Sequence, residues 1–277
     1  FQFDFLNDDF TKLPQSLQDI INDEEKRKKL VIYINPPYAE ATSTKTISSS
    51  NSLHKENVGK SKTKDKYEKL LNQASKELYV QFLFRIYKEL PGSYIANFSK
   101  IKTLQGNHYK EFRNVFLAKL EKLFIVPSYT FDNVKGRFPV GFFIWNTNIK
   151  SSFQNIFADV YNENGLFSQS KYLFAPENRN IKDWLRNYNI NDNSIGYLVR
   201  GSADVQNNNV VFITLNPSDS VLKASNASKI SSKNLIVVSI FLAVRKVIDQ
   251  NWINDRDQYL YPTDDCIIDI EFHNNCL

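Results

Sequence analysis

The feature that most constrains the fold is the stretch at residues 30–38, where the apolar run Leu-Val-Ile-Tyr-Ile leads directly into Asn-Pro-Pro-Tyr. An uninterrupted run rich in β-branched residues predicts a buried strand of a parallel sheet. The two prolines end the strand, because proline cannot donate to a hydrogen-bonded ladder. Asn35 and Tyr38 are therefore expected at the carboxyl end of a central strand, where open α/β sheets place their ligands.

The groups that follow this strand suit a planar base that carries an amino group. An exocyclic amine on a purine is a poor nucleophile, because its lone pair is spread into the ring. The side-chain oxygen of Asn35 and the carbonyl of Pro36 would accept hydrogen bonds from the amine and draw its nitrogen toward a tetrahedral form. Tyr38 offers a flat ring that would stack on the base and hold it in place.

Together Asn35, Pro36, Pro37 and Tyr38 resemble the catalytic motif of the amino-methyltransferases that use S-adenosylmethionine, above all the N6-adenine DNA methyltransferases. The resemblance covers about the first 150 residues and implies an α/β fold, the second half of a Rossmann-like methyltransferase sheet. It implies methyl transfer from S-adenosylmethionine to adenine N6 in double-stranded DNA, with the target base flipped out of the helix. The enzyme type implied is a bacterial restriction–modification enzyme with methylation and cleavage fused in one type IIG-like chain.

Two alternatives stay open. The same four residues also occur in amino-methyltransferases that act on a glutamine of a protein or on RNA. A non-catalytic fragment that binds DNA or a protein partner is the alternative from a different class.

The first residues extend the resemblance. Residues 1–6 alternate like a short strand, and a similar Asp-Phe-Leu segment lies one strand before the catalytic motif in the family. The resemblance implies that Asp4 accepts from the amino group of the cofactor adenine and that Phe5 packs on its ring. The glycine-rich cofactor loop of the family should precede Asp4, yet none of the eight glycines lies in a G-x-G pattern. Because the chain also contains no methionine, we expect a fragment that binds cofactor weakly by itself.

The pattern after the motif predicts further α/β elements. Residues 41–64 are rich in Ser, Thr, Lys and Asn, which predicts a mobile loop that closes over cofactor and DNA or a plain insertion. From Asp65 the apolar spacing predicts a helix that runs to Leu90. Strands at 94–98, 122–127 and 138–145 and a helix at 108–121 follow, with the final antiparallel strand inserted beside its neighbour.

The turn before the last of these strands carries candidate DNA contacts. In the family an aromatic residue at this turn stacks on the flipped base, and the resemblance gives this role to Phe131, with Phe138 as the second candidate. Lys135 and Arg137 beside them suit phosphate contacts.

The rest of the composition sets limits on partners and compartment. Residues 1–138 carry a net charge of +7 and residues 139–277 a net charge of −2, so the basic half fits a polyanion. We expect a catalytic domain at 1–150 and an appended α+β region at 151–277 that helps to choose the DNA sequence. The two cysteines predict reduced thiols in a cytoplasmic protein, and we expect no metal site and no membrane association. The oligomeric state is left open.

Overall fold

The computed structural model describes residues 1–36, 60–131, 136–175, 179–191, 193–224, 226–255, 257–263 and 265–277. The chain divides into two compact units. Unit 1 comprises Phe1–Val134 and Val140–Pro176, and unit 2 comprises Lys135–Pro139 and Glu177–Leu277. The boundary that we expected at residue 150 falls inside unit 1, because the two strands that follow it pair with the sheet of that unit.

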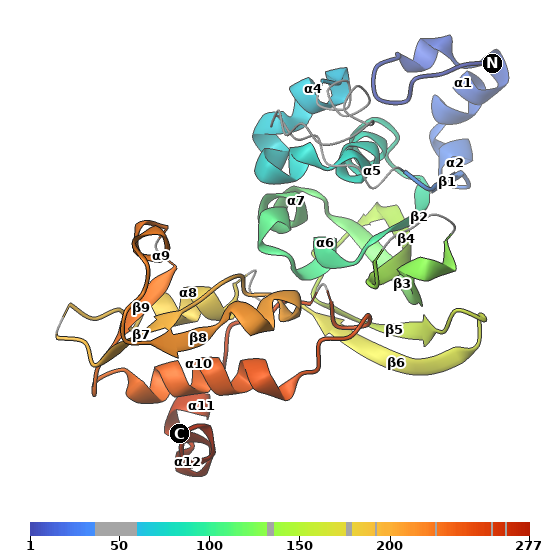
Figure 1. Ribbon diagram of the computed structural model, residues 1–277. Helices are drawn as coiled ribbons and strands as arrows, with labels where there is room; N and C mark the ends of the chain where they lie inside the picture. The colour runs from blue at the N-terminus through green and yellow to red at the C-terminus, as the bar shows by residue number, and fades with distance from the viewer. Residues whose placement is uncertain are drawn as a thin grey trace. The chain divides into compact units, whose positions relative to one another are not determined.

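Unit 1 is built on a six-stranded sheet of order β1-β2-β4-β3-β5-β6 (Figure 1). The strands are β1 (Val31–Ile34), β2 (Tyr94–Lys100), β3 (Ala118–Pro127), β4 (Pro139–Lys150), β5 (Asn155–Tyr161) and β6 (Phe167–Phe174). β1 runs parallel to β2 and β3 parallel to β5, whereas β4 is antiparallel to β2 and β6 is antiparallel to β5. The predicted α/β class is confirmed, and β4 is the expected antiparallel strand, inserted between β2 and β3.

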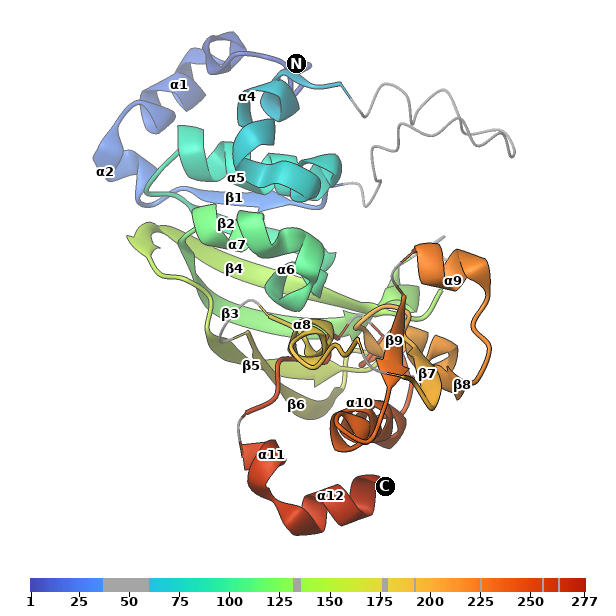
Figure 2. The ribbon, with the colours of Figure 1, turned by 90° about the vertical axis from the view of Figure 1, so that its left-hand side faces the viewer.

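The described helices of unit 1 either precede β1 or lie between its strands along the chain. They are η1 (Phe10–Lys12), α1 (Gln15–Ile21), α2 (Glu24–Arg27), α4 (Lys62–Leu71), η2 (Asn72–Lys76), α5 (Leu78–Glu89), α6 (Lys102–Gln105), η3 (Asn107–Tyr109), α7 (Lys110–Val115) and η4 (Ser128–Thr130). α5, α6 and α7 lie on one face of the sheet, in front of it in Figure 2. Of the helices in the described ranges, none is long and apolar enough to cross a bilayer.

The two faces of the sheet differ in composition. On the helix-covered face, Ile95, Phe143 and Trp145 are buried, and the ring of Phe116 packs edge-on against Trp145 at 5.1 Å. The opposite face, here called the aromatic face, carries rings whose contacting neighbours lie 4.7 to 6.3 Å apart between centroids. Its members are Tyr33, Phe98, Phe124, Phe142, Phe157, Tyr161, Phe167, Tyr172 and Phe174. Phe157 is 72% exposed, so part of this face lies open to solvent.

β1 departs from the predicted buried central strand. Its parallel pairing with β2 is confirmed, but β1 lies at the edge of the described sheet. Successive side chains of a strand point to opposite faces, so Ile32 and Ile34 are half-buried on the helix side. Val31 and Tyr33 point to the aromatic face and are 60% and 62% exposed. The prediction of a strand buried on both faces is therefore wrong, because among the described residues neither the edge nor the aromatic face of β1 is fully covered.

The predicted strand at residues 1–6 is also wrong. The backbone there forms a turn, in which the amides of Asn7 and Asp8 donate to the carbonyl of Asp4 at 3.1 and 2.8 Å. The carboxylate of Asp4 accepts from the amide of Leu6 at 3.0 Å. Aspartate bonds of this kind compete with a ladder and favour a turn.

The single helix predicted from Asp65 to Leu90 is divided in two. α4 begins earlier than expected, with Ser61 as its N-cap, and the helix is broken at Asn72, whose φ is +49°. The short η2 follows, and α5 resumes the helix at Leu78. Residues 61–64 of the expected loop thus belong to the start of α4, and residues 41–59 lie outside the described part of the chain.

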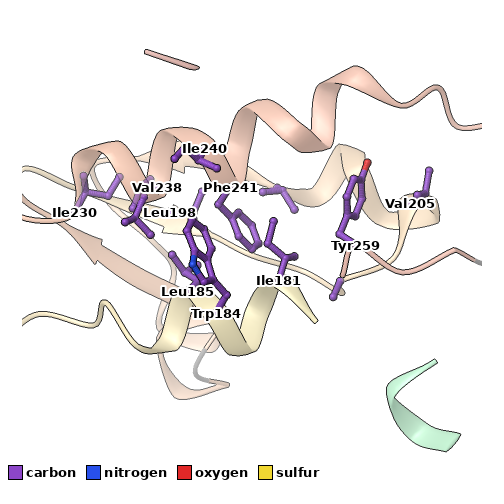
Figure 3. Packing of buried hydrophobic residues seen from close by; sticks show 13 residues of the cluster. Ile181, Trp184, Leu185, Leu198, Val205, Ile230, Val238, Ile240, Phe241 and Tyr259 are labelled. Atoms are coloured by element: carbon purple, nitrogen blue, oxygen red, sulfur yellow. The ribbon is translucent and has the colours of Figure 1, made fainter. Parts of the chain in front are cut away.

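Unit 2 is an α+β arrangement around its own small sheet. Its elements are α8 (Ile181–Arg186), β7 (Gly196–Val199), η5 (Val205–Val210), β8 (Phe212–Thr214), α9 (Asp219–Lys223), β9 (Ala227–Ile230), α10 (Leu235–Val247), α11 (Asp265–Ile268) and α12 (Ile270–Cys276). The three strands are antiparallel in the order β8-β7-β9. Figure 3 shows the core between α8, α10 and the strands, where Trp184, Leu198 and Phe241 are buried.

Candidate functional site

The candidate site is the edge of the sheet at the carboxyl ends of β1 and β2. Asn35 directly follows β1 and is exposed, whereas Pro36 is buried. Because β1 and β2 are parallel, their carboxyl ends lie at the same edge. Asn35 thus follows the carboxyl end of a parallel strand, but this strand lies at the edge of the described sheet and not, as was predicted, at its centre. Pro37 and Tyr38 lie outside the described residues.

Phe131 is connected to the carboxyl ends of β1 and β2 by the ring of Phe98, which it contacts. Ile34, the last residue of β1, pairs with Asn97, so Asn35 comes level with Phe98 on the neighbouring strand. Continuing the alternation of Val31 and Tyr33 assigns Asn35 to the aromatic face, which Phe98 shares. The ring of Phe131 packs edge-on against Phe98, with 5.2 Å between centroids, and is half-buried. The structure thus connects Phe131 to the end of β1, although the two are far apart in sequence.

The other candidates of the same turn are less defined. Phe138 is half-buried and Arg137 is exposed, which suits a core contact for the first and a solvent or ligand contact for the second. Lys135 lies outside the described residues.

Asp4 and Phe5 lie in a separate group with α4 and α5. The Asp4 carboxylate is exposed and accepts from the Leu6 amide and, at 2.8 Å, from the side chain of Asn7. A carboxylate has about four lone-pair sites, so it can still accept from an amino or hydroxyl group. The ring of Phe5 is stacked on Phe82 at 5.2 Å with an interplanar angle of 8°. Asp4 therefore fits one contact to a cofactor adenine, while Phe5 already has one ring face covered.

A buried polar cluster that the sequence analysis missed lies beyond the end of β2. The Glu77 carboxylate accepts from Lys102 at 2.6 Å and from the hydroxyl of Tyr109 at 2.7 Å, and Tyr79 donates to Tyr109 at 2.6 Å. Burial, with the neighbouring Tyr79 and Glu77, holds the pKa of Tyr109 well above its usual range, so this hydroxyl stays protonated and donates. The second oxygen of Glu77, Oε2, is buried and has no hydrogen-bond partner among the described residues.

The cluster ties the start of α5 to the segment after β2. Glu77 precedes α5 and Lys102 opens α6, so their ion pair joins two elements at the carboxyl edge. Its only trace in the sequence is an acidic residue at the start of an apolar helix. The partner of that acid is 25 residues away, and no local pattern identifies it.

Comparison with known proteins assigns no family to the chain. No family model matches the chain, and no curated protein matches it. Among solved structures, the chain is similar to an ATP-dependent Type ISP restriction-modification enzyme, LlaBIII, bound to DNA, with 13% sequence identity and a TM-score of 0.34. The match covers 66% of this chain and 15% of that chain, so the chain spans a small part of the length of that enzyme.

Proposed function

We propose that this chain carries the catalytic strand of an enzyme that transfers a methyl group from S-adenosylmethionine to adenine N6 in double-stranded DNA. The observation that supports the proposal most is the position of Asn35 at the carboxyl end of a parallel strand, level with Phe98 and thereby close to Phe131. A polar acceptor and aromatic rings at one edge of a sheet are the groups that a flipped base with an amino group requires. The fold is taken to be the second half of a Rossmann-like sheet, on the basis of the strand order β1-β2-β4-β3.

Asn35 and Pro36 would act on the amine in a defined way. The side-chain oxygen of Asn35 and the carbonyl of Pro36 would accept hydrogen bonds from the two N6 hydrogens, which draws the nitrogen lone pair out of conjugation with the purine ring. The nitrogen would then approach tetrahedral geometry and attack the methyl carbon in line, the bond from that carbon to the donor sulfur would break as the N–C bond forms, and one of the N6 protons would afterwards be lost to solvent. These acceptors matter most in the transition state, because the hydrogens become more acidic as the new N–C bond forms.

The remaining residues would orient the reactants. When bound, S-adenosylmethionine supplies the electrophilic methyl group, and Asp4 would accept from its adenine amino group. Phe5 would contact that adenine only with the part of its ring that Phe82 and Arg85 leave uncovered. Tyr38 and Phe131 would cover the two faces of the target base, and Lys135 and Arg137 would contact phosphates.

The test is the substitution Asn35→Ala in the full-length protein. We expect methyl transfer to fall by about 100-fold or more while DNA binding is retained, because one preorganised polar contact to the transition state is lost. Formation of N6-methyladenine in duplex DNA, measured by mass spectrometry, gives the rate, and a gel-shift titration gives the affinity.

Asn148→Ala is the matched control. Asn148 is an exposed asparagine near the end of β4, and its substitution should leave both quantities unchanged. Wild-type turnover by Asn35→Ala would remove Asn35 from the mechanism. Methyl transfer by the wild type to RNA or to a glutamine side chain, but to no DNA, would contradict the proposed substrate.

A further inference from the structure

The turn at residues 4–8 is held on α4 and α5 by contacts that are remote in sequence. The backbone amide and the hydroxyl of Thr63 both donate to the carbonyl of Leu6, at 3.2 and 2.7 Å. The amide of Lys62 donates to the side chain of Asn7 at 3.0 Å. These bonds attach the turn to the first residues of α4.

The most extensive of the remote contacts come from Arg85 of α5, which is 6% exposed. Its Nη1 donates to the carbonyl of Phe5, and its Nη2 donates to the carbonyl of Asp8 at 2.7 Å. The guanidinium group also lies 5.3 Å from the ring centroid of Phe5 and 4.5 Å from that of Phe10. One side chain thus binds the turn near both of its ends and packs on the aromatic rings that flank it.

Arg85 is itself fixed by a third bond. Its Nε donates to Glu89 at 2.9 Å, and Glu89 also accepts from Lys66 and from the hydroxyl of Tyr67, each at 2.8 Å. Burial alone would raise the pKa of Glu89, but these hydrogen bonds outweigh it and hold the pKa below its usual range. Glu89 therefore stays ionised at neutral pH and orients the planar guanidinium group toward the turn.

We propose that Arg85 is a positioning residue that fixes residues 4–8, and through them the Asp4 carboxylate and the Phe5 ring, for binding of the cofactor adenosine. The inference rests on the proposed function for the role of Asp4 and Phe5, but the contacts of Arg85 stand apart from it. Residues 4–8 form a turn without a strand ladder, so the bonds from Lys62, Thr63 and Arg85 are what hold it on α4 and α5. Lysine could not replace arginine here, because three donors in a fixed plane are used at once.

The first test measures the turn without any cofactor. Amide hydrogen exchange at Asn7 and Asp8 is compared in the wild type, Arg85→Gln and Arg113→Gln. Arg113 is a matched control, because it is 8% exposed and also holds two backbone carbonyls, those of Thr103 and Gly106, at 3.0 and 2.8 Å. We expect Arg85→Gln to lose roughly tenfold or more of the protection at Asn7 and Asp8 and Arg113→Gln to retain it.

The second test adds S-adenosylmethionine at millimolar concentration and follows the amide resonances of residues 4–8 by NMR. We expect them to shift in the wild type and in Arg113→Gln, and the apparent affinity to fall about tenfold or more in Arg85→Gln. Arg85→Lys should recover only part of the loss, in protection and in affinity alike.

The outcomes distinguish the positioning role of Arg85 from the cofactor roles of Asp4 and Phe5. If Arg85→Gln keeps the protection of Asn7 and Asp8, or if Arg113→Gln loses as much of it, Arg85 does not position the turn. If protection depends on Arg85 but S-adenosylmethionine shifts no resonance of residues 4–8 in the wild type, the turn is not a cofactor contact. In that case the cofactor roles of Asp4 and Phe5 in the proposed function fail, while the contacts of Arg85 remain.

Discussion

At the scale of single residues, Phe131 offers the sharpest test of a flipped base. A base outside the helix loses its stacking neighbours, and aromatic side chains must replace them. Phe131 packs edge-on against Phe98 and is half-buried, so part of its ring is available to a ligand. Base–aromatic stacking contributes about 1–3 kcal/mol, so Phe131→Ala should weaken capture of the target base about ten- to a hundredfold. Phe131→Trp should retain most of it.

The measurement is the fluorescence of 2-aminopurine at the target position of a duplex, titrated with the full-length protein. Phe157→Ala serves as the control, because Phe157 belongs to the same aromatic face and is highly exposed but lies on β5. An unchanged signal in Phe131→Ala together with a lost signal in Phe138→Ala would show that the stacking ring is Phe138. The absence of a signal with wild-type protein on every duplex would count against DNA as the substrate.

The sequence identifies a residue when its role can be inferred from the residues next to it in the chain. Asn35 was placed at the end of a parallel strand by the apolar run before it and the prolines after it. Arg85, Glu77 and Lys102 were missed, because their roles depend on partners distant in sequence. Arg85 reaches a carbonyl 80 residues away, and charged residues in helices read as solvent-exposed until the tertiary contact is known.

At the scale of elements, the junction of α4 and α5 carries a strained residue. Asn72 has φ +49° and ψ −124°, a conformation that glycine adopts with little cost and other residues rarely adopt. We expect Asn72→Gly to raise the free energy of unfolding by about 1 kcal/mol and Asn72→Ala to lower it by about the same amount. Thermal unfolding followed by circular dichroism would show both changes.

Gln73→Gly is the control for Asn72→Gly. Gln73 is the exposed neighbour and has an ordinary negative φ, so glycine there should only destabilise the chain. Equal destabilisation by glycine at both positions would show that Asn72 is not strained.

The same junction explains why one long helix was predicted. Tyr67, Leu71, Ala74 and Leu78 keep a helical spacing across the break, and all four are buried. The apolar period therefore carries no sign of the turn between them. β1 shows the converse case, because its apolar run predicted the strand and its direction but not its position at a sheet edge, which depends on neighbours along the sheet.

At the scale of the whole molecule, the two units have separate hydrophobic cores. Leu198 is fully buried in unit 2, and Leu83 is buried in α5 of unit 1. Truncation of a buried leucine to alanine typically costs about 2–5 kcal/mol. We expect two thermal transitions by calorimetry, with Leu198→Ala lowering one of them and Leu83→Ala lowering the other. A single transition that both substitutions lower would show that the units unfold together.

The division between the units could not be placed from the sequence. Residues 151–176 read as short strands with polar turns, and such strands can join either of two neighbouring sheets. Pairing decides the question, because β5 lies beside β3 and β6 lies beside β5 in the larger sheet. The main segment of unit 2, Glu177–Leu277, contains both helices and a three-stranded sheet.

The aromatic face has a consequence for the behaviour of the chain in solution. Its rings extend across strands from β1 to β6, and these two strands are the open edges of the described sheet. Exposed apolar area favours adsorption, and unpaired strand edges favour pairing with other chains. We therefore expect the purified chain to adsorb to plastic and hydrophobic resins and to self-associate as the protein and salt concentrations rise. Charged solubilising additives or mild detergents should reduce this adsorption and self-association, whatever the enzymatic activity of the chain.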